Sequence, residues 1–317
     1  MISESDVKYR TVLFITASTT RSLSVRNGEL LLTEENGDVV TKLSFKKILA
    51  VFIAGKCTLT SPVFEAFSKH AVPFCLMKQS LRPILWNASM AEGNYLLRQK
   101  QYNLDKNDIS IAKVLIQNKI ENQVRLMERI PSCDRNLNKM TLYLERLQQP
   151  IQYEELMTIE AHTAQIFFKD WFRPLGWDSR QPRIKSDPVN VALDIGYTVL
   201  FNFIEANLRF FGFDLYKGVY HRLFFQRKSL VCDLMEPFRC IIDKETLEAF
   251  KDKRFRKSHF TVIDRQYKLK EDKSYSYWKE YAEAVIGRKT EIFHYVRAYY
   301  RAFMKGLPGK DYPKFLI

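Results

Sequence analysis

The character of the sequence changes near residue 90, and this change limits the fold more than any other feature. Up to that point short apolar runs alternate with turn signals, among which Asn27-Gly28 is a strong hairpin signal. From about Asn94 onward the apolar residues recur at helical spacing, most clearly over 109–130. A run of strands followed by a run of helices predicts an α+β chain with two domains.

We therefore expect a small amino-terminal domain, a β-sheet or β-sandwich, over 1–88 and a larger all-α domain over 94–306. Residues 307–317, which follow Gly306, are expected to form a flexible tail. Within the larger domain, Asp187-Pro188 predicts the start of a long apolar helix, because proline is favoured in the first turn of a helix.

The charge of the chain indicates an anionic partner. Lysine and arginine number 50 against 36 aspartate and glutamate residues, which gives a net charge of +14. Nucleic acid and an anionic membrane surface both attract such a charge, and a generally basic surface is the third interpretation. No stretch approaches the roughly 20 apolar residues that span a bilayer, and the start, MISESDVKYR, lacks the pattern of a signal peptide. We therefore expect no membrane partner.

The cysteine pattern excludes two kinds of site. The five cysteines lie at positions 57, 75, 133, 232 and 240, and none forms a C-x-x-C pair. This spacing fits neither a disulfide framework nor a zinc ribbon. Free thiols in a reducing cytoplasm are the simplest interpretation.

One carboxylate falls on an apolar helix face. A helix over 156–171 places five residues on one side: Leu156, Glu160, Ala164, Phe167 and Trp171. Because burying an unpaired carboxylate is costly, Glu160 needs a partner, which is an arginine, a lysine or a metal ion. From this segment alone, a buried Glu–Arg pair and a metal ligand both stay open.

A second segment, 218–239, combines an imidazole with carboxylates. It holds His221, one of only five histidines, and Asp233 and Glu236, which share a helix face. Such a set suits Mn²⁺ or Mg²⁺. The alternatives are that Asp233 is a helix N-cap with Glu236 as its capping-box partner, and that His221 is a packing residue.

The same segment carries a group of basic residues: Arg222, Arg227, Lys228 and Arg239. Beside a metal and its carboxylates, they would bind phosphates on either side of a scissile bond. The alternative for Arg239 is an ion pair with the carboxylate three residues before it. No Walker loop, G-x-G-x-x-G or G-x-S-x-G motif occurs, so an NTP-binding site is not expected.

Three segments, in order, resemble the CRISPR-associated adaptation endonuclease/integrase family (Cas-one). TIEAHTAQIFF, around Glu160, is similar to the family's I-E-G/A-x-x-A-x-x-Y/F helix. DPVNVALDIGY, from Asp187, is close to D-P-x-N-x-x-L-x-x-x-Y. SLVCDLMEPFR, which follows His221, is close to S-L-x-x-D-L-x-E-x-F-R. The resemblance covers the whole helical region, and the β-rich start fits the family's smaller amino-terminal domain.

The resemblance implies roles for individual residues. Three of them match the family's metal-binding catalytic positions: Glu160, His221 and Glu236. Asp233 matches a supporting acid, and Asn190 matches a motif asparagine near the site. Arg239 matches a basic position that flanks it. The implied cofactor is Mg²⁺ or Mn²⁺.

The implied activity is the insertion of short DNA fragments (spacers) into a CRISPR repeat array. In this reaction a 3′-hydroxyl attacks a phosphodiester, and the metal polarises the phosphoryl oxygen. The implied partners are double-stranded DNA (protospacer and repeat), a second copy of the chain and a small bridging protein of the Cas-two family. The β-rich domain would supply dimer and DNA contacts, and the setting would be the cytoplasm of a prokaryote.

Two other classes of function remain open from the sequence. The first is a metal-dependent, structure-selective DNA nuclease that never integrates, which would use the same metal chemistry. The second is a non-catalytic DNA-binding scaffold, which would keep the +14 charge but would need no buried carboxylates.

Overall fold

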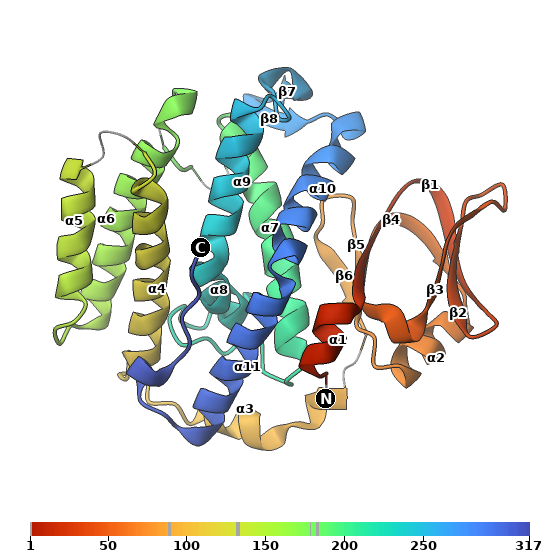
Figure 1. Cartoon of the computed structure of the whole chain (residues 1–317), viewed down its shortest axis with the longest axis horizontal. Helices are drawn as coiled ribbons and strands as arrows, with labels where there is room; N and C mark the ends of the chain where they lie inside the picture. The colour runs from red at the N-terminus through yellow and green to blue at the C-terminus, as the bar shows by residue number, and fades with distance from the viewer. Residues whose placement is uncertain (1, 88–89, 131–133, 178, 182–183) are drawn as a thin grey trace. The chain divides into compact units, whose positions relative to one another are not determined.

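The computed structural model describes residues 2–87, 90–130, 134–177, 179–181 and 184–317 (Figure 1). The chain divides into two compact units. The first combines Met1–Arg98 with Glu205–Phe213, and the second combines Gln99–Ile204 with Asp214–Ile317. Cys133 lies outside the described residues, and the other four cysteines are free thiols.

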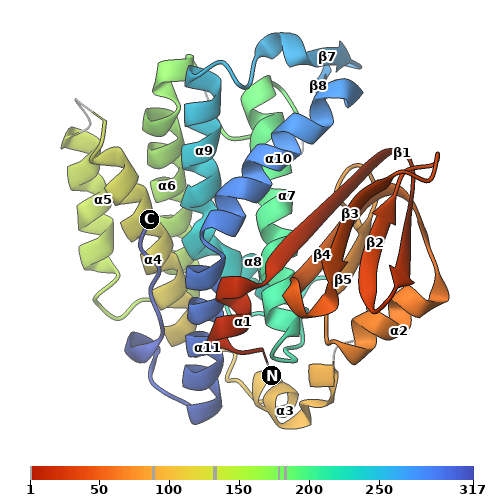
Figure 2. The same cartoon turned by 45° about the vertical axis from the view of Figure 1, so that its right-hand side comes forward.

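Most of the first unit is a six-stranded sheet with the order β3-β2-β1-β4-β5-β6 (Figure 2). Its strands are β1 (Thr11–Arg26), β2 (Glu29–Thr33), β3 (Val39–Ser44), β4 (Ile48–Leu59), β5 (Phe74–Met77) and β6 (Pro83–Trp86). β4 runs parallel to both β1 and β5, and the other pairings are antiparallel. The expected amino-terminal β region is confirmed, and it is one mixed sheet rather than a sandwich.

The predicted hairpin joins β1 to β2. Asn27 and Gly28 both have positive φ, 52° and 74°, as the two central residues of a type I′ turn require. The turn sets the register in which Arg26 pairs with Glu29. Besides the short α1 (Glu4–Tyr9), the unit contains α2 (Ser61–Lys69), which buries Val63 and Phe67 in the core of the sheet.

The second unit is built mainly from helices. The helices that follow the sheet are α3 (Tyr95–Tyr102), α4 (Ser110–Met127), α5 (Asp134–Arg146), α6 (Tyr153–Trp171), α7 (Pro188–Arg209), α8 (Ser229–Met235), α9 (Arg239–Lys251), α10 (Glu271–Gly287) and α11 (Lys289–Lys305). α4, α5 and α6 lie side by side (Figures 1 and 2). A small hairpin of β7 (Phe260–Ile263) and β8 (Gln266–Leu269) interrupts the helices, which an all-α expectation does not include.

α7 starts at Pro188, as predicted. The backbone N–H of Asn190 donates to Oδ1 of Asp187, 2.8 Å away, so Asp187 satisfies a free donor of the first turn. By length and composition α7 is apolar enough to cross a membrane, so the expectation that no segment comes close is wrong for this helix. However, 78% of its apolar stretch is buried inside the protein. Gly196 allows close packing, because a Cβ there would lie only 2.4 Å from Ile242.

The residues after Gly306 differ from the flexible tail expected from the sequence. Tyr312 and Phe315 are buried. The backbone of Phe315 exchanges two hydrogen bonds of 2.8 Å with the side chain of Asn118 in α4. Asn122, one turn further along α4, bonds Phe315 and Ile317. Two buried asparagine side chains thus satisfy the backbone of the tail and hold it against α4.

Candidate active site

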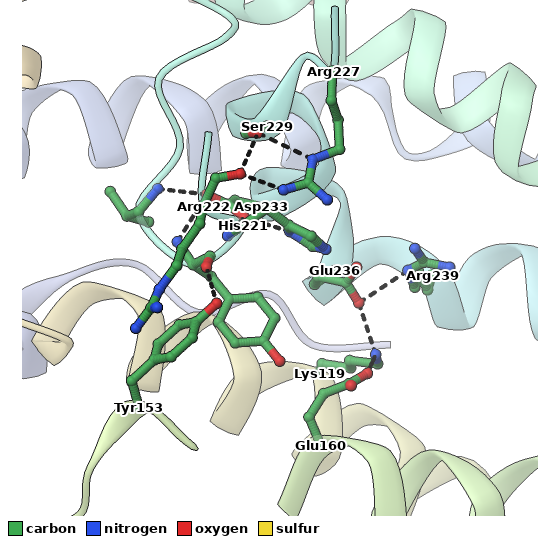
Figure 3. Close-up of polar contacts among 12 residues, drawn as sticks. Lys119, Tyr153, Glu160, His221, Arg222, Arg227, Ser229, Asp233, Glu236 and Arg239 are labelled. Atoms are coloured by element: carbon green, nitrogen blue, oxygen red, sulfur yellow. Dashed lines mark hydrogen bonds and ion pairs between the residues drawn. The ribbon is translucent and has the colours of Figure 1, made fainter. Parts of the chain in front are cut away.

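Two of the sequence-predicted carboxylates meet at a single lysine. Lys119 comes from α4, Glu160 from α6, and Glu236 from the 3₁₀ turn that follows α8 (Figure 3). The Nζ atom of Lys119 contacts Oε1 of Glu160 and lies 2.8 Å from Oε2 of Glu236. One ammonium group therefore bridges two carboxylates that are 76 positions apart in the sequence.

The packing of α6 decides how exposed Glu160 is. The buried residues of this helix include Leu156, Ile159, Thr163 and Phe167, so the buried face is centred beside Glu160 rather than on it. The Glu160 side chain keeps 24% of its exposure. Of the partners that the sequence allowed for it, the structure supplies a lysine.

Glu236 lies deeper and is paired twice. Its side chain is only 4% exposed, and its Oε2 atom lies 2.9 Å from Nε of Arg239 as well as close to Lys119. Burial alone would raise the pKa of Glu236, but Arg239, Lys119 and His221 together lower it to about 2. Glu236 is therefore an ionised carboxylate at neutral pH, and the alternative ion pair of Arg239 is present.

His221 is held by Asp233. Nδ1 of the His221 ring lies 2.7 Å from Oδ1 of Asp233, and the ring points toward Glu236 (Figure 3). The Asp233 carboxylate also accepts backbone N–H bonds from Val219, Tyr220 and His221, at 2.6, 3.0 and 2.8 Å. The N-cap of α8 is Lys228, so the alternative of Asp233 as a helix cap is wrong.

Gly218 leaves the space in which the loop before α8 packs against the Asp233 carboxylate. A Cβ atom on Gly218 would lie 2.6 Å from Oδ2 of Asp233 and 2.8 Å from the backbone oxygen of His221. No real Cβ contact is that short, so a larger residue would push the loop off the carboxylate.

The donor groups fit a divalent metal ion in their chemistry. Glu160 and Glu236 offer hard carboxylate oxygens, and the hydrogen bond that Nδ1 of His221 donates to Asp233 leaves Nε2 to bind a metal ion. Oε2 of Glu236 is buried and accepts no hydrogen bond of good geometry, although two cations lie beside it. Among the described residues, no three His, Cys, Asp or Glu side chains form a cluster that could hold a metal in this conformation. Lys119 lies between Glu160 and Glu236 instead.

Asn190 lies apart from this cluster. Its buried side chain accepts bonds from Arg180 and from the backbone of Gln181, and it donates to Asp187 and Ser179. It therefore braces the segment before α7. Its connection to the cluster is indirect.

Tyr197 provides that connection. The Arg180 guanidinium lies 5.6 Å from the centre of the Tyr197 ring, and the Arg239 guanidinium lies 4.6 Å from it. The Tyr197 hydroxyl donates to Oδ1 of Asp243 at 2.5 Å. The second sequence motif, which contains Asn190 and Tyr197, thus contacts the cluster through stacked arginines.

The remaining basic residues lie on the loop between His221 and α8. The Arg222 side chain is 69% exposed and stacks over the Tyr153 ring at 4.1 Å. Arg227 turns back and donates to the backbone oxygen of Arg222, while Lys228 is half-buried. Three apolar side chains of the same loop are exposed: Leu223, Phe224 and Phe225. Of the group predicted to contact phosphates, Arg222 is the most open to solvent.

Sequence reasoning missed Lys119. It lies in α4 among buried neighbours such as Ile116 and Ile120, and its side chain is 7% exposed. The signal was available, because a lysine on a buried helix face needs an anionic partner for the same reason that Glu160 needs a cationic one. Tyr197 was missed as well, although it ends the second motif.

A family model described as CRISPR associated protein Cas1 matches residues 13–283. The chain belongs to the Cas1 family. The family expected from the three sequence motifs is thereby confirmed. A curated relative, "CRISPR-associated endonuclease Cas1 1" of Thermodesulfovibrio yellowstonii, is 28% identical over 226 residues, which are 67% of this chain and 71% of the relative.

Solved structures share the fold with this Cas1 family member. A chain of a "Cas6-RT-Cas1--Cas2 complex" superposes with a TM-score of 0.78 at 18% identity, over 97% of this chain and 36% of that longer chain. A "Casposase bound to integration product" gives a TM-score of 0.76 at 16% identity, over 96% of this chain and 94% of the casposase chain.

Proposed function

We propose that this chain is a divalent-metal-dependent DNA endonuclease and integrase, which inserts short DNA fragments into a CRISPR repeat array by 3′-hydroxyl transesterification. The observation that carries the proposal is the meeting of Glu160 and Glu236 at the Lys119 ammonium, with His221 close enough to Glu236 to lower the pKa of its carboxyl. Two similar proteins support this class of reaction: the curated relative is named an endonuclease, and the casposase of similar fold is bound to an integration product.

In this proposal Glu160, Glu236 and Nε2 of His221 hold Mg²⁺ or Mn²⁺. The bound ion would supply Lewis-acid polarisation of the scissile phosphodiester. Asp233 fixes the orientation of the His221 ring, because it accepts from Nδ1 and so presents Nε2. Arg239, anchored between Glu236 and Tyr197, keeps a positive charge beside the reacting phosphate.

The DNA would be bound largely through its phosphates. The net charge of +14 favours such binding, and the exposed Arg222 lies next to His221 in the sequence. Arg227 and Lys228 would contribute positive potential from partly buried positions. The remaining partners in the proposal are a second copy of the chain and a Cas2-type bridging protein, the latter because a similarly folded chain occurs in a complex with Cas2.

An integration assay tests the proposal and separates its competitors. Purified protein, with and without a Cas2-type partner, is incubated with a labelled short DNA duplex and a supercoiled plasmid that carries a repeat array. Label joined to the plasmid in Mg²⁺ or Mn²⁺, and lost in EDTA, is the expected result. Metal-dependent nicks without joined label would indicate a nuclease that does not integrate. DNA binding with neither product would indicate a scaffold.

Glu160→Gln is the most informative variant. Glu160 is partly exposed, and its loss leaves the Lys119–Glu236 ion pair in place, so the fold should be retained. Glu155→Gln is the matched control, because Glu155 lies on the same helix and pairs with Arg146 on the surface. We expect Glu160→Gln to bind DNA but lose at least a hundredfold in joining rate, whereas Glu155→Gln joins normally. Normal joining by Glu160→Gln would refute the assigned site.

A further inference from the structure

We propose that Lys119 is a resident counter-cation of the site. Its ammonium group holds Glu160 and Glu236 together in the metal-free protein, and it leaves the position between them when a divalent ion binds. This inference rests on the proposed metal-dependent function. It assigns Lys119 a positioning role, which acts through the two carboxylates rather than on DNA.

The burial of Lys119 is the first argument. A lysine side chain that is 7% exposed is uncommon and needs compensation, and here two carboxylates provide it. The Nζ atom of Lys119 contacts carboxylate oxygens of both Glu160 and Glu236, and these contacts stabilise its charged form against the cost of burial. Lys119 therefore places a positive charge at the point where the two carboxylates meet.

The charge balance is the second argument. Glu160 and Glu236 carry two negative charges, and Lys119 and Arg239 already neutralise them. A divalent ion added to this set would leave two uncompensated positive charges at short range in a poorly solvated place. The ion and the ammonium therefore compete for the same carboxylate oxygens.

The contacts that fix the side chains of Lys119 and Arg239 are the third argument. The side chain with fewer fixed contacts is the one that a metal ion displaces. The Arg239 guanidinium is fixed against the Tyr197 ring as well as against Glu236. Lys119 has a flexible four-carbon stem, and its ammonium is held by the two carboxylates. The backbone of α4 is held by its asparagine bonds to the tail, so only the lysine side chain has to swing out.

Manganese binding, measured from the EPR signal of free Mn²⁺, tests the inference without an activity assay. Lys119→Met removes the charge and keeps the length of the side chain. Lys119→Gln is the second variant, because its amide still donates to the carboxylates if the methionine variant fails to fold. Lys113→Met is the matched control: Lys113 lies on the same helix and donates to the backbone oxygen of Gln149 instead. Glu160→Gln is the reference for the site, because Mn²⁺ binding that this variant loses is binding that depends on Glu160.

We expect both Lys119 variants to bind Mn²⁺ at least tenfold more tightly than the parent protein, and Lys113→Met to bind like the parent. The metal-free Lys119 variants should melt at a lower temperature, and saturating Mn²⁺ should raise their melting temperature more than that of the parent. Equal or weaker Mn²⁺ binding by the Lys119 variants, with parent binding that depends on Glu160, would overturn the role of Lys119 alone. No Glu160-dependent binding in any of the proteins would overturn the proposed metal site together with it.

Discussion

Asp233 and His221 are joined twice, because one carboxylate oxygen, Oδ1, accepts both the backbone N–H and the ring Nδ1 of the histidine, at 2.8 and 2.7 Å. The second oxygen accepts the N–H groups of Val219 and Tyr220. The buried carboxylate therefore fixes both the backbone and the ring of His221. It is a support for the proposed ligand rather than a ligand with free oxygens.

The first prediction concerns Asp233→Asn. The amide NH₂ would face backbone donors that have lost an acceptor, so we expect the free energy of unfolding to fall by about 2 kcal/mol. Joining should slow by about 10- to 100-fold, as expected when the support of a metal ligand is lost. Urea unfolding and initial rates, measured where the variant is folded, check both effects. Glu236→Gln should be more severe in joining, and the reverse order would make Asp233 the third ligand.

The second prediction concerns Gly218→Ala. The added Cβ would meet Oδ2 of Asp233 at 2.6 Å, so the loop must move and the hydrogen bonds to the carboxylate must lengthen. We expect destabilisation of about 2 kcal/mol or more, with slower joining. The control is Gly287→Ala, where nothing lies within 4 Å and alanine favours the helix. Equal melting temperatures for the two variants would show that the loop tolerates the extra atom.

The third prediction is a pH dependence carried by Asp243. Burial raises its pKa to about 7, against the effects of its Tyr197 hydrogen bond and of Arg239, Lys119 and Arg180. Between about pH 4 and pH 7 the folded protein therefore binds a proton that the unfolded chain has lost. The stability from this group is fully present below pH 4 and is lost as the pH rises toward 7, by up to about 1.4 kcal/mol per pH unit.

Asp243→Asn isolates this contribution, since the amide oxygen can still accept from Tyr197 and the side chain does not titrate. The unfolding free energies of the parent and the variant are compared at pH 5 and pH 7. We expect the parent to lose roughly 2 kcal/mol relative to the variant over this interval. Parallel pH profiles would mean that Asp243 is already ionised at pH 5.

The fourth prediction concerns the exposed Arg222. If it contacts a phosphate, Arg222→Ala should weaken DNA binding for all sequences and reduce the slope of log affinity against log salt by about 1. Lys279→Ala is the control, because it removes an equal charge from an exposed position on α10. Fluorescence anisotropy over a range of salt concentrations gives both slopes. Identical slopes for the two variants would place Arg222 outside the DNA interface.

The features that could be predicted from sequence are those that depend on neighbouring residues. The turn at Asn27-Gly28 needs only two residues that accept positive φ, and the start of α7 needs only Asp187 and Pro188. That the Glu160 carboxylate needs a cationic partner also follows from the sequence of its own helix. The cost of burying a charged side chain and the period of a helix depend on residues close together in the chain, so both can be predicted from the sequence.

The features that could not be predicted join distant parts of the chain. Lys119 meets Glu160 across 41 positions, and Phe315 meets Asn118 across 197. Nothing in α4 alone shows whether its buried polar residues face a carboxylate, a backbone or a core water. The motif asparagine, Asn190, shows another limit of the sequence. Its family position predicts a place near the site, but only the structure shows that its hydrogen bonds serve the segment before α7 and that Arg180 and Tyr197 lie between it and Arg239.

The hydrogen bonds between α4 and the residues around Phe315 have a consequence for biosynthesis. A ribosome completes α4 long before it reaches Phe315, so Asn118 and Asn122 emerge without the backbone groups that later satisfy them. Asn122 also bonds the backbone oxygen of Pro237, the neighbour of Glu236. The helix that carries Lys119 therefore acquires these hydrogen bonds only after Phe315 has been synthesised. A nascent chain that has not yet made Phe315 lacks one of the two partners of the Asn122 amide, the other being the backbone next to Glu236.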